Sequence, residues 1–158
     1  MLFRSSGGGQ SLYEPEPIYQ ASFKIPSNPE GRRGIPDVAY NADPYNGFAI
    51  YDSVRFRWAA GWFQVGGTSA GPPQWAGLIA IVNSLRVAKR KFPLTGSNES
   101  LYRAANNAPN YGSNFHDIVT GINGSCGDLC TAVPGYDYVT GLGTPRADQL
   151  IMKLVNAP

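Results

Sequence analysis

The sequence is poor in the residues that bind transition metals through nitrogen and sulfur. It contains one histidine, His116, and two cysteines, Cys126 and Cys130. A zinc site needs about four ligands, so these three residues argue against one. A small disulfide within the segment SCGDLC is the favoured state of the cysteines, with two free thiols as the alternative. A disulfide would fit an exported protein.

Charge is also scarce: only 15% of the residues are charged, and the net charge is +2. This charge is too small and too dispersed to indicate a nucleic-acid partner. The densest basic cluster comprises Arg86, Lys89, Arg90 and Lys91. It falls at the end of a predicted helix, where cations favour the helix dipole, so we expect a solvated helix end.

Long apolar runs are absent too. No run approaches the roughly 20 residues that a membrane-spanning helix needs, so we expect no membrane partner. The first residues, MLFRSSGGGQSLYEPEP, lack a charged segment followed by an apolar one, and so do not form a signal peptide. A glycine-rich loop is an unusual start for a domain. We therefore expect Met1 to be internal to a longer protein, or the gene to be truncated.

Glycine and proline, by contrast, are plentiful, with 19 and 13 residues, which is too many for a helical bundle. Strands alternate with helices in the predicted order, which favours an α/β fold. We expect a strand over 35–39, a hairpin over 47–53 and 55–65, a helix beginning almost at Ser69, and a helix from Asn98 through Ala105. A long loop over 106–143 and a helix from the Thr144 cap and Pro145 through Val155 complete the prediction.

The segment GGTSAGPP places Ser69 between a β-rich run and an apolar helix. One interpretation is a helix N-cap, which serine commonly provides. The other is a nucleophile whose hydroxyl lies beside free N–H groups at the positive end of a helix. Gly67, Ser69 and Gly71 also satisfy the G-x-S-x-G pattern of α/β-hydrolases, which would require His116 as the base.

The segments around Ser69 together resemble the sedolisins, the serine-carboxyl peptidases. The resemblance rests on SSGGGQS, PEPIYQ, GRRGIPDVAYNADPYNGFAIY and VGGTSAGPPQWAGLIAIVN, in that order and spacing. It covers nearly all of residues 1–158, as the C-terminal portion of one catalytic domain with a serine motif at 66–73 and no second domain. It implies a subtilisin-like α/β parallel-sheet sandwich, of which this chain covers roughly the C-terminal half. It also implies a secreted serine-type endopeptidase that acts on peptides or proteins through an acyl-enzyme on Ser69.

A calcium site is predicted within the loop 116–137. Carboxylates and turn carbonyls in a glycine-rich loop are the hard oxygen ligands that calcium prefers. The sedolisin resemblance implies one Ca²⁺ there, bound by the side chains of Asp117 and Asp137 and by the backbone carbonyls of Ile118, Val133 and Gly135. Val133 stands where the family usually has glycine. His116 is then structural, and the cysteine pair would stiffen the calcium loop.

The resemblance also implies acidic partners that this chain does not match. The family uses a glutamate as base toward the serine, an aspartate bonded to that glutamate, and a further aspartate at the oxyanion hole. Glu14, Glu16 and Glu30 lie in proline-rich, surface-like segments and are not assigned to these roles. We therefore expect the isolated chain to be a poor or inactive peptidase whose partner is the missing N-terminal half of the catalytic domain. The alternatives are a non-catalytic fragment that retains only the fold and calcium binding, and an α/β-hydrolase esterase.

Overall fold

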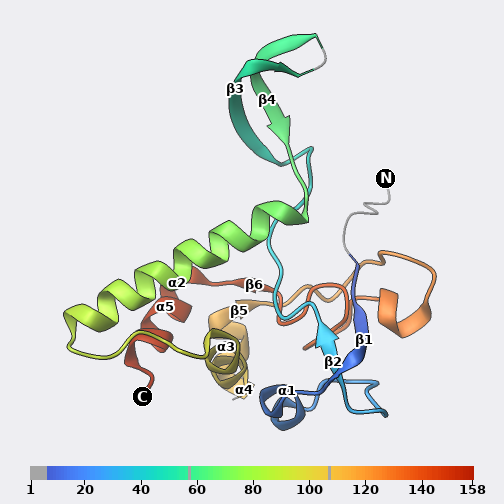
Figure 1. Cartoon of the computed structure of the whole chain (residues 1–158). Coiled ribbons are helices and arrows are strands. Elements are labelled where there is room, and N and C mark those ends of the chain that lie inside the picture. The colour runs from blue at the N-terminus through green and yellow to red at the C-terminus, as the bar shows by residue number, and fades with distance from the viewer. Residues whose placement is uncertain (1–6, 57, 107) are drawn as a thin grey trace.

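The computed structural model describes residues 7–56, 58–106 and 108–158 of the chain (Figure 1). Short strands and helices are interleaved along the chain, as expected for an α/β fold. The elements in order are β1 (Gly9–Pro15), α1 (Ile18–Phe23), β2 (Arg32–Ile35), β3 (Phe48–Phe56), β4 (Ala59–Val65), the 3₁₀ turn η1 (Thr68–Ala70), α2 (Gly71–Ala88), α3 (Ser97–Ala105), α4 (Ala108–Asn114), β5 (Phe115–His116), the 3₁₀ turn η2 (Gly127–Cys130), β6 (Thr144–Pro145) and α5 (Ala147–Asn156).

The described strands pair as three antiparallel ladders, β1 with β2, β3 with β4, and β5 with β6. The parallel sheet that the sedolisin resemblance implies is therefore not assembled among the described residues. A two-stranded ribbon is marginal on its own, so each ladder depends on the surfaces packed against it.

The core lies where α2, α3 and α5 pack together (Figure 1). Trp75, Leu78 and Val82 are spaced by three and four residues along α2, and their side chains are buried in this core. Leu85 continues the predicted apolar face but is 40% exposed, and the neighbouring Arg86 is buried instead. The buried apolar side chains of the three helices are Trp75, Leu78, Val82, Leu101, Tyr102, Ala104, Ala105, Leu150, Leu154 and Val155.

Arg86 overturns the expectation of a solvated basic cluster at the end of α2. Its guanidinium donates hydrogen bonds to the carbonyl oxygens of Phe92, Leu154, Ala157 and Pro158 at 2.8–3.0 Å. These carbonyls include the C-terminal end of α5, where a cation is favoured by the helix dipole. Arg86 thus fastens α2 to the end of α5.

A second polar cluster fastens α1 to β2 and α3. Gln20 is fully buried, accepts from the N–H of Gly34 and donates to its carbonyl, both at 2.8 Å. The same amide donates to the hydroxyl of Tyr102 at 2.8 Å. Asp37 accepts from Tyr102 at 3.0 Å and forms a 2.5 Å ion pair with Arg33. Both the oxygen and the nitrogen of the buried Gln20 amide are therefore hydrogen-bonded.

Three predicted elements differ from the structure. The strand expected over 35–39 is wrong, because β2 ends at Ile35; Pro36 has no N–H to donate to a ladder. The loop expected over 106–143 contains α4, η2 and β5. The last helix begins at Ala147, since Thr144 and Pro145 pair with β5 as β6.

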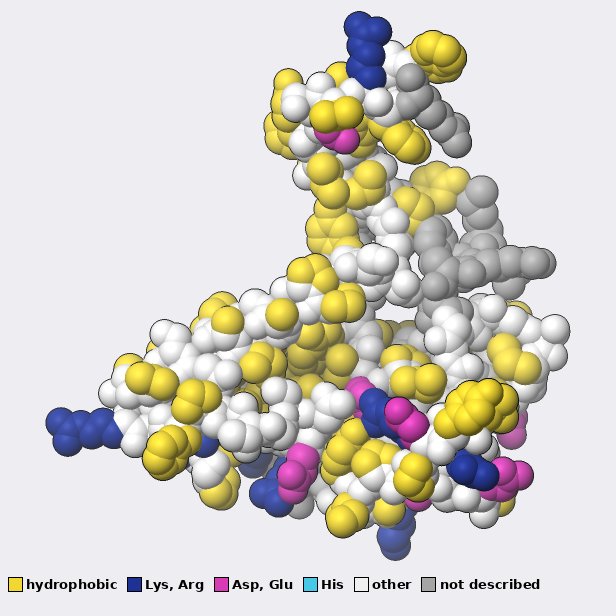
Figure 2. Space-filling model, in the orientation of Figure 1, with side chains coloured by type: hydrophobic (Ala, Val, Ile, Leu, Met, Phe, Trp, Pro, Cys, Tyr) yellow, Lys and Arg dark blue, Asp and Glu magenta, His cyan; other side chains and the backbone are white. Residues whose placement is uncertain are grey.

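The hairpin β3–β4 projects away from the rest of the molecule (Figure 1). Hydrophobic side chains gather over it in the space-filling view (Figure 2), and Tyr51, Phe56, Trp58 and Trp62 are all more than 60% exposed. No helix in the described part of the chain combines the length and apolar character needed to cross a bilayer.

Candidate active site

Ser69 lies in η1, the tight turn that joins β4 to α2. It is exposed, and among the described residues its hydroxyl makes no hydrogen bond. The N-cap position of α2 belongs to Ala70, and no side chain caps this helix. The N-cap interpretation of Ser69 is therefore wrong, and its hydroxyl is free for another use.

The backbone around Ser69 leaves few donors at the start of α2. The N–H of Ala70 bonds to the carbonyl of Gly67 at 3.1 Å, and that of Gly71 bonds to Thr68. Pro72 and Pro73 have no N–H. The N–H of Ser69 has no acceptor among the described residues. It is therefore available to a negatively charged oxygen near the hydroxyl.

The two glycines before Thr68 serve different purposes. A side chain on Gly66 would approach the backbone nitrogen of Pro44 to 2.4 Å, so this glycine accommodates the chain's own loop. Gly67 has φ +148° and open space where a side chain would lie. Only Gly67 thus leaves room beside Ser69 for a bound molecule.

A groove of about 710 Å³ opens beside Ser69, between the base of the β3–β4 hairpin and the start of α2. Its size lies within the roughly 300–1,000 Å³ range typical of ligand sites. Apart from Ser69 and the amide of Gln74, its walls are apolar or glycine. It is lined by Phe48, Ile50, Val65, Gly66, Gly67, Ser69, Ala70, Pro73 and Gln74.

No side chain in this groove could take a proton from Ser69 as a general base. None of the lining residues is a carboxylate or an imidazole. His116 lies on β5, where it pairs with Thr144, and is not part of the groove. The described residues therefore supply a hydroxyl and an N–H donor but no base, which gives the α/β-hydrolase interpretation no support.

The predicted calcium residues lie in the segments on either side of η2. Asp117 accepts a hydrogen bond from the N–H of Gly135 at 2.8 Å through Oδ2. Its other oxygen, Oδ1, is buried and has no hydrogen-bond partner among the residues that the structure describes. A buried carboxylate oxygen without a donor is costly, and a cation would compensate it.

Asp137 is 1% exposed and organises the turn that follows it. Its carboxylate accepts from the N–H groups of Val133, Val139 and Thr140 at 2.7–3.2 Å. The structure therefore joins Val133 to Asp137 and Gly135 to Asp117. Within the described residues there is no cluster of three or more His, Cys, Asp or Glu side chains suited to a metal.

Tyr111 of α4 is a neighbour of these carboxylates that was not expected from the sequence. Its hydroxyl donates to the carbonyl of Leu142 at 3.1 Å. Burial raises the pKa of Tyr111, and the charges of Asp117 and Asp137 raise it further. No motif in the sequence marks Tyr111, because α4 itself lacks an apolar helical pattern.

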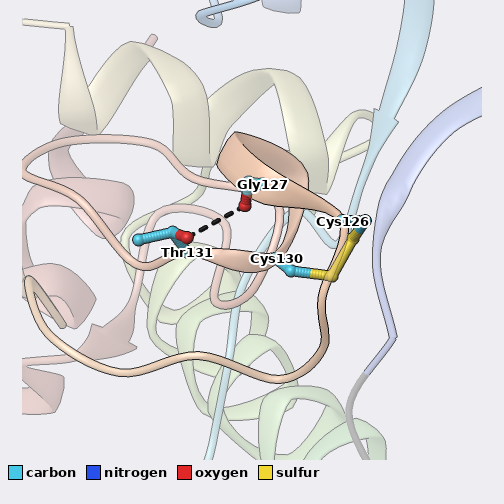
Figure 3. The surroundings of a disulfide bond; sticks show 4 residues. All are labelled: Cys126, Gly127, Cys130 and Thr131. Carbon is cyan, nitrogen blue, oxygen red and sulfur yellow. Dashed lines mark hydrogen bonds between the residues drawn. A yellow bond between two sulfur atoms is a disulfide. The ribbon is translucent and has the colours of Figure 1, made fainter.

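A disulfide joins Cys126 to Cys130 across η2 (Figure 3), as favoured from the sequence. In the same turn, the hydroxyl of Thr131 donates to the carbonyl of Gly127 at 2.9 Å. The flanking chain forms a short antiparallel bridge between Ile122 and Thr131. The disulfide therefore closes a compact turn within the loop between Asp117 and Val133.

Comparison with known proteins places this arrangement in a family. No family model matches the chain. Over 89% of this chain, the sequence is 34% identical to sedolisin from Pseudomonas sp. (strain 101). Over 96% of this chain, it is 34% identical to kumamolisin from Bacillus sp. (strain MN-32). Human tripeptidyl-peptidase 1 is 32% identical over 96% of the chain. The chain spans 21%, 26% and 28% of these three relatives, respectively.

The fold agrees with the sequence comparison. A solved Pseudomonas sedolisin, described as a serine-carboxyl proteinase in complex with two molecules of pseudo-iodotyrostatin, superposes with a TM-score of 0.71. The match covers 92% of this chain and 35% of the sedolisin chain, at 34% identity. The described residues thus have part of the α/β, subtilisin-like fold. The chain belongs to the sedolisin family.

Proposed function

We propose that this chain carries the nucleophile of a sedolisin-type serine endopeptidase, and that Ser69 is that nucleophile. The observation that supports the proposal most strongly is the free hydroxyl of Ser69 in a groove of a sedolisin-family chain. Its matched relatives include a serine-carboxyl proteinase and a tripeptidyl-peptidase.

In this proposal the hydroxyl of Ser69 attacks the carbonyl carbon of a substrate peptide bond. The carbonyl oxygen gains negative charge in the tetrahedral intermediate, and the free N–H of Ser69 stabilises it. Collapse of the intermediate transfers the proton taken from Ser69 to the departing nitrogen, breaks the C–N bond to release the amine, and leaves an acyl-enzyme, which water hydrolyses. Gly67 leaves open space for the substrate backbone to approach.

The proton of Ser69 must pass to a base outside the described residues. A serine hydroxyl without a base is a weak nucleophile, so the chain alone should be a poor peptidase. We propose that the acidic base comes from the N-terminal half of a sedolisin-type catalytic domain. The partners are thus that half and a peptide or protein substrate.

The test is peptide hydrolysis by a protein in which this chain is joined to such a half, compared with its Ser69→Ala variant. We expect the variant to lose at least about 10³-fold in kcat, since a catalytic nucleophile acts as one unit with its base. Thr68→Ala is the matched control, because it removes the neighbouring hydroxyl and should retain most activity. Unchanged hydrolysis by Ser69→Ala would refute the assignment.

The second candidate function is a non-catalytic fragment that retains only the fold and calcium binding. It is favoured by the absence of any carboxylate or imidazole from the described groove around Ser69. It predicts no Ser69-dependent hydrolysis even when the chain is joined to an N-terminal half.

We also propose one structural Ca²⁺ at the loop that contains Asp117 and Asp137. The buried Oδ1 of Asp117 supports it, because within the described part of the chain this oxygen accepts no hydrogen bond. The ligands would be the two carboxylates and the carbonyls of Ile118, Val133 and Gly135, which are hard oxygen donors. This ligand set uses two acidic side chains and three carbonyl oxygens. It therefore does not need the cluster of three or more His, Cys, Asp or Glu side chains that is absent from the described residues.

Thermal unfolding with calcium or with a chelator tests this site. At a calcium concentration 100-fold above Kd, we expect roughly 2.7 kcal/mol of stabilisation. Asp117→Asn should remove most of the calcium-dependent rise in Tm, whereas the exposed Asp128→Asn should not. The same Tm in calcium and in chelator would refute the site.

Finally, we propose that the parent protein is secreted. The disulfide between Cys126 and Cys130 supports this, since disulfides persist mainly in oxidising compartments. Detection of the parent protein in the culture medium, with this disulfide intact by mass spectrometry, would test it. Retention in the cytoplasm would contradict it.

A further inference from the structure

The groove beside Ser69 has one wall built entirely by one face of the β3–β4 hairpin. In this ladder Phe48 pairs with Val65, and Ile50 pairs with Phe63. Alternate residues of a strand share a face, so these four side chains point the same way. Tyr51 and Trp62 pair with each other on the opposite face, with ring centroids 5.4 Å apart.

The chemistry of the groove restricts what can occupy it. None of its lining residues is charged, and Phe48, Ile50, Val65 and Pro73 make its walls apolar. A charged group placed there would lose hydration without gaining a partner. An apolar group would instead cover Ile50, which is 48% exposed.

The position of the groove indicates the occupant. Ser69 itself lines the groove, so a group bound there lies beside this residue. Phe48 and Ile50 are two residues apart on β3, a span of about 7 Å. An extended peptide covers that distance in about two residues, so the groove reaches one or two positions from a bond held at Ser69.

We propose that this groove is a specificity subsite that binds an apolar side chain of the substrate, within two residues of the bond that Ser69 attacks. The inference rests on the proposed peptidase function, and it deepens that function by naming the substrate feature that the chain selects. Phe48, Ile50 and Val65 are the specificity-determining residues, with Pro73 as the opposite wall.

The subsite is tested by NMR titration of the ¹⁵N-labelled chain with two blocked tripeptides, Ac-Ala-Leu-Ala-NH₂ and Ac-Ala-Asp-Ala-NH₂. We expect the leucine peptide to shift the amide signals of Gly66, Ser69 and Ala70 saturably. The aspartate peptide should bind at least about tenfold more weakly, as expected for an apolar pocket. Equal binding of the two peptides, no binding of either, or shifts confined to other surfaces would each overturn the subsite.

Two matched variants sharpen the result. Ile50→Asp places a charge on the groove face, and Tyr51→Asp places one on the opposite face of the same strand. We expect Ile50→Asp to weaken leucine-peptide binding at least about tenfold and Tyr51→Asp to leave it unchanged. If Ile50→Asp disturbs the hairpin, the comparison of the two peptides on the unmodified chain still decides.

Binding and catalysis fail separately in this design. If the peptide binds and Ser69 proves non-catalytic, the subsite stands and the peptidase proposal falls. If Ser69 is catalytic but leucine and aspartate peptides bind equally, the subsite falls alone.

Discussion

Arg86 offers a sharp test of how this chain is held together. The side chain is 4% exposed and donates four hydrogen bonds to backbone carbonyls of Phe92, Leu154, Ala157 and Pro158. No Asp or Glu side chain among the described residues lies within ion-pair distance of it. The stability that it contributes therefore comes from these carbonyls and from the dipole of α5.

Replacing Arg86 with methionine keeps much of the apolar stem and removes all four donors. Hydrogen bonds to charged groups contribute about 1.5–3 kcal/mol each. In the variant, water can reach the end of α5 and form hydrogen bonds to some of the carbonyl oxygens that Arg86 leaves. We expect a net loss of roughly 3–5 kcal/mol in the free energy of unfolding. Urea denaturation followed by circular dichroism measures it.

Lys89→Met is the matched control on the same helix. The Lys89 side chain is exposed and, among the described residues, makes a single hydrogen bond, to the side chain of Asn156 at 3.2 Å. We expect a change of less than about 0.5 kcal/mol, as for most surface substitutions. Equal, small effects of the two substitutions would refute the burial and capping of Arg86.

Two further changes test the polar and covalent links of the fold. Gln20→Leu should destabilise the chain by about 2–4 kcal/mol, because it leaves the N–H and carbonyl of Gly34 without their hydrogen-bond partners. Chemical denaturation measures this loss. An unchanged stability would mean that water reaches both groups of Gly34 in the variant. Replacing Cys126 and Cys130 together with serine should cost about 2 kcal/mol, as expected for so short a loop. Thermal unfolding measures this cost, and an unchanged Tm would show that η2 is ordered without the disulfide.

The sequence predicted the elements that have a clear period. The alternation over 47–65 gave the hairpin, and the spacing from Trp75 to Val82 gave the buried face of α2. It missed α4, because residues 108–114 contain proline, glycine and asparagine but no apolar helical pattern. The sequence also predicted that Arg86 is exposed to solvent. A charged residue in a sequence does not indicate which carbonyl oxygens will surround it, and one of those that bind Arg86 belongs to Leu154, 68 residues away.

The sequence proposes the identity of the candidate nucleophile but does not predict the geometry around it. The resemblance selected Ser69, and its hydroxyl and N–H make no hydrogen bond with any residue that the structure describes. The groove beside it could not be predicted from the sequence, because its walls come from two different elements, the hairpin and α2. The unpartnered Oδ1 of Asp117 likewise depends on how separate segments of one loop pack.

The central claim is that Ser69 forms an acyl-enzyme. The most direct measurement is mass spectrometry of the chain, joined to a sedolisin-type N-terminal half and quenched with acid during turnover of a peptide substrate. The account predicts an acyl adduct on the peptide that contains Ser69, and no adduct in Ser69→Ala. Hydrolysis that proceeds with the adduct on another residue, or undiminished in Ser69→Ala, would contradict it.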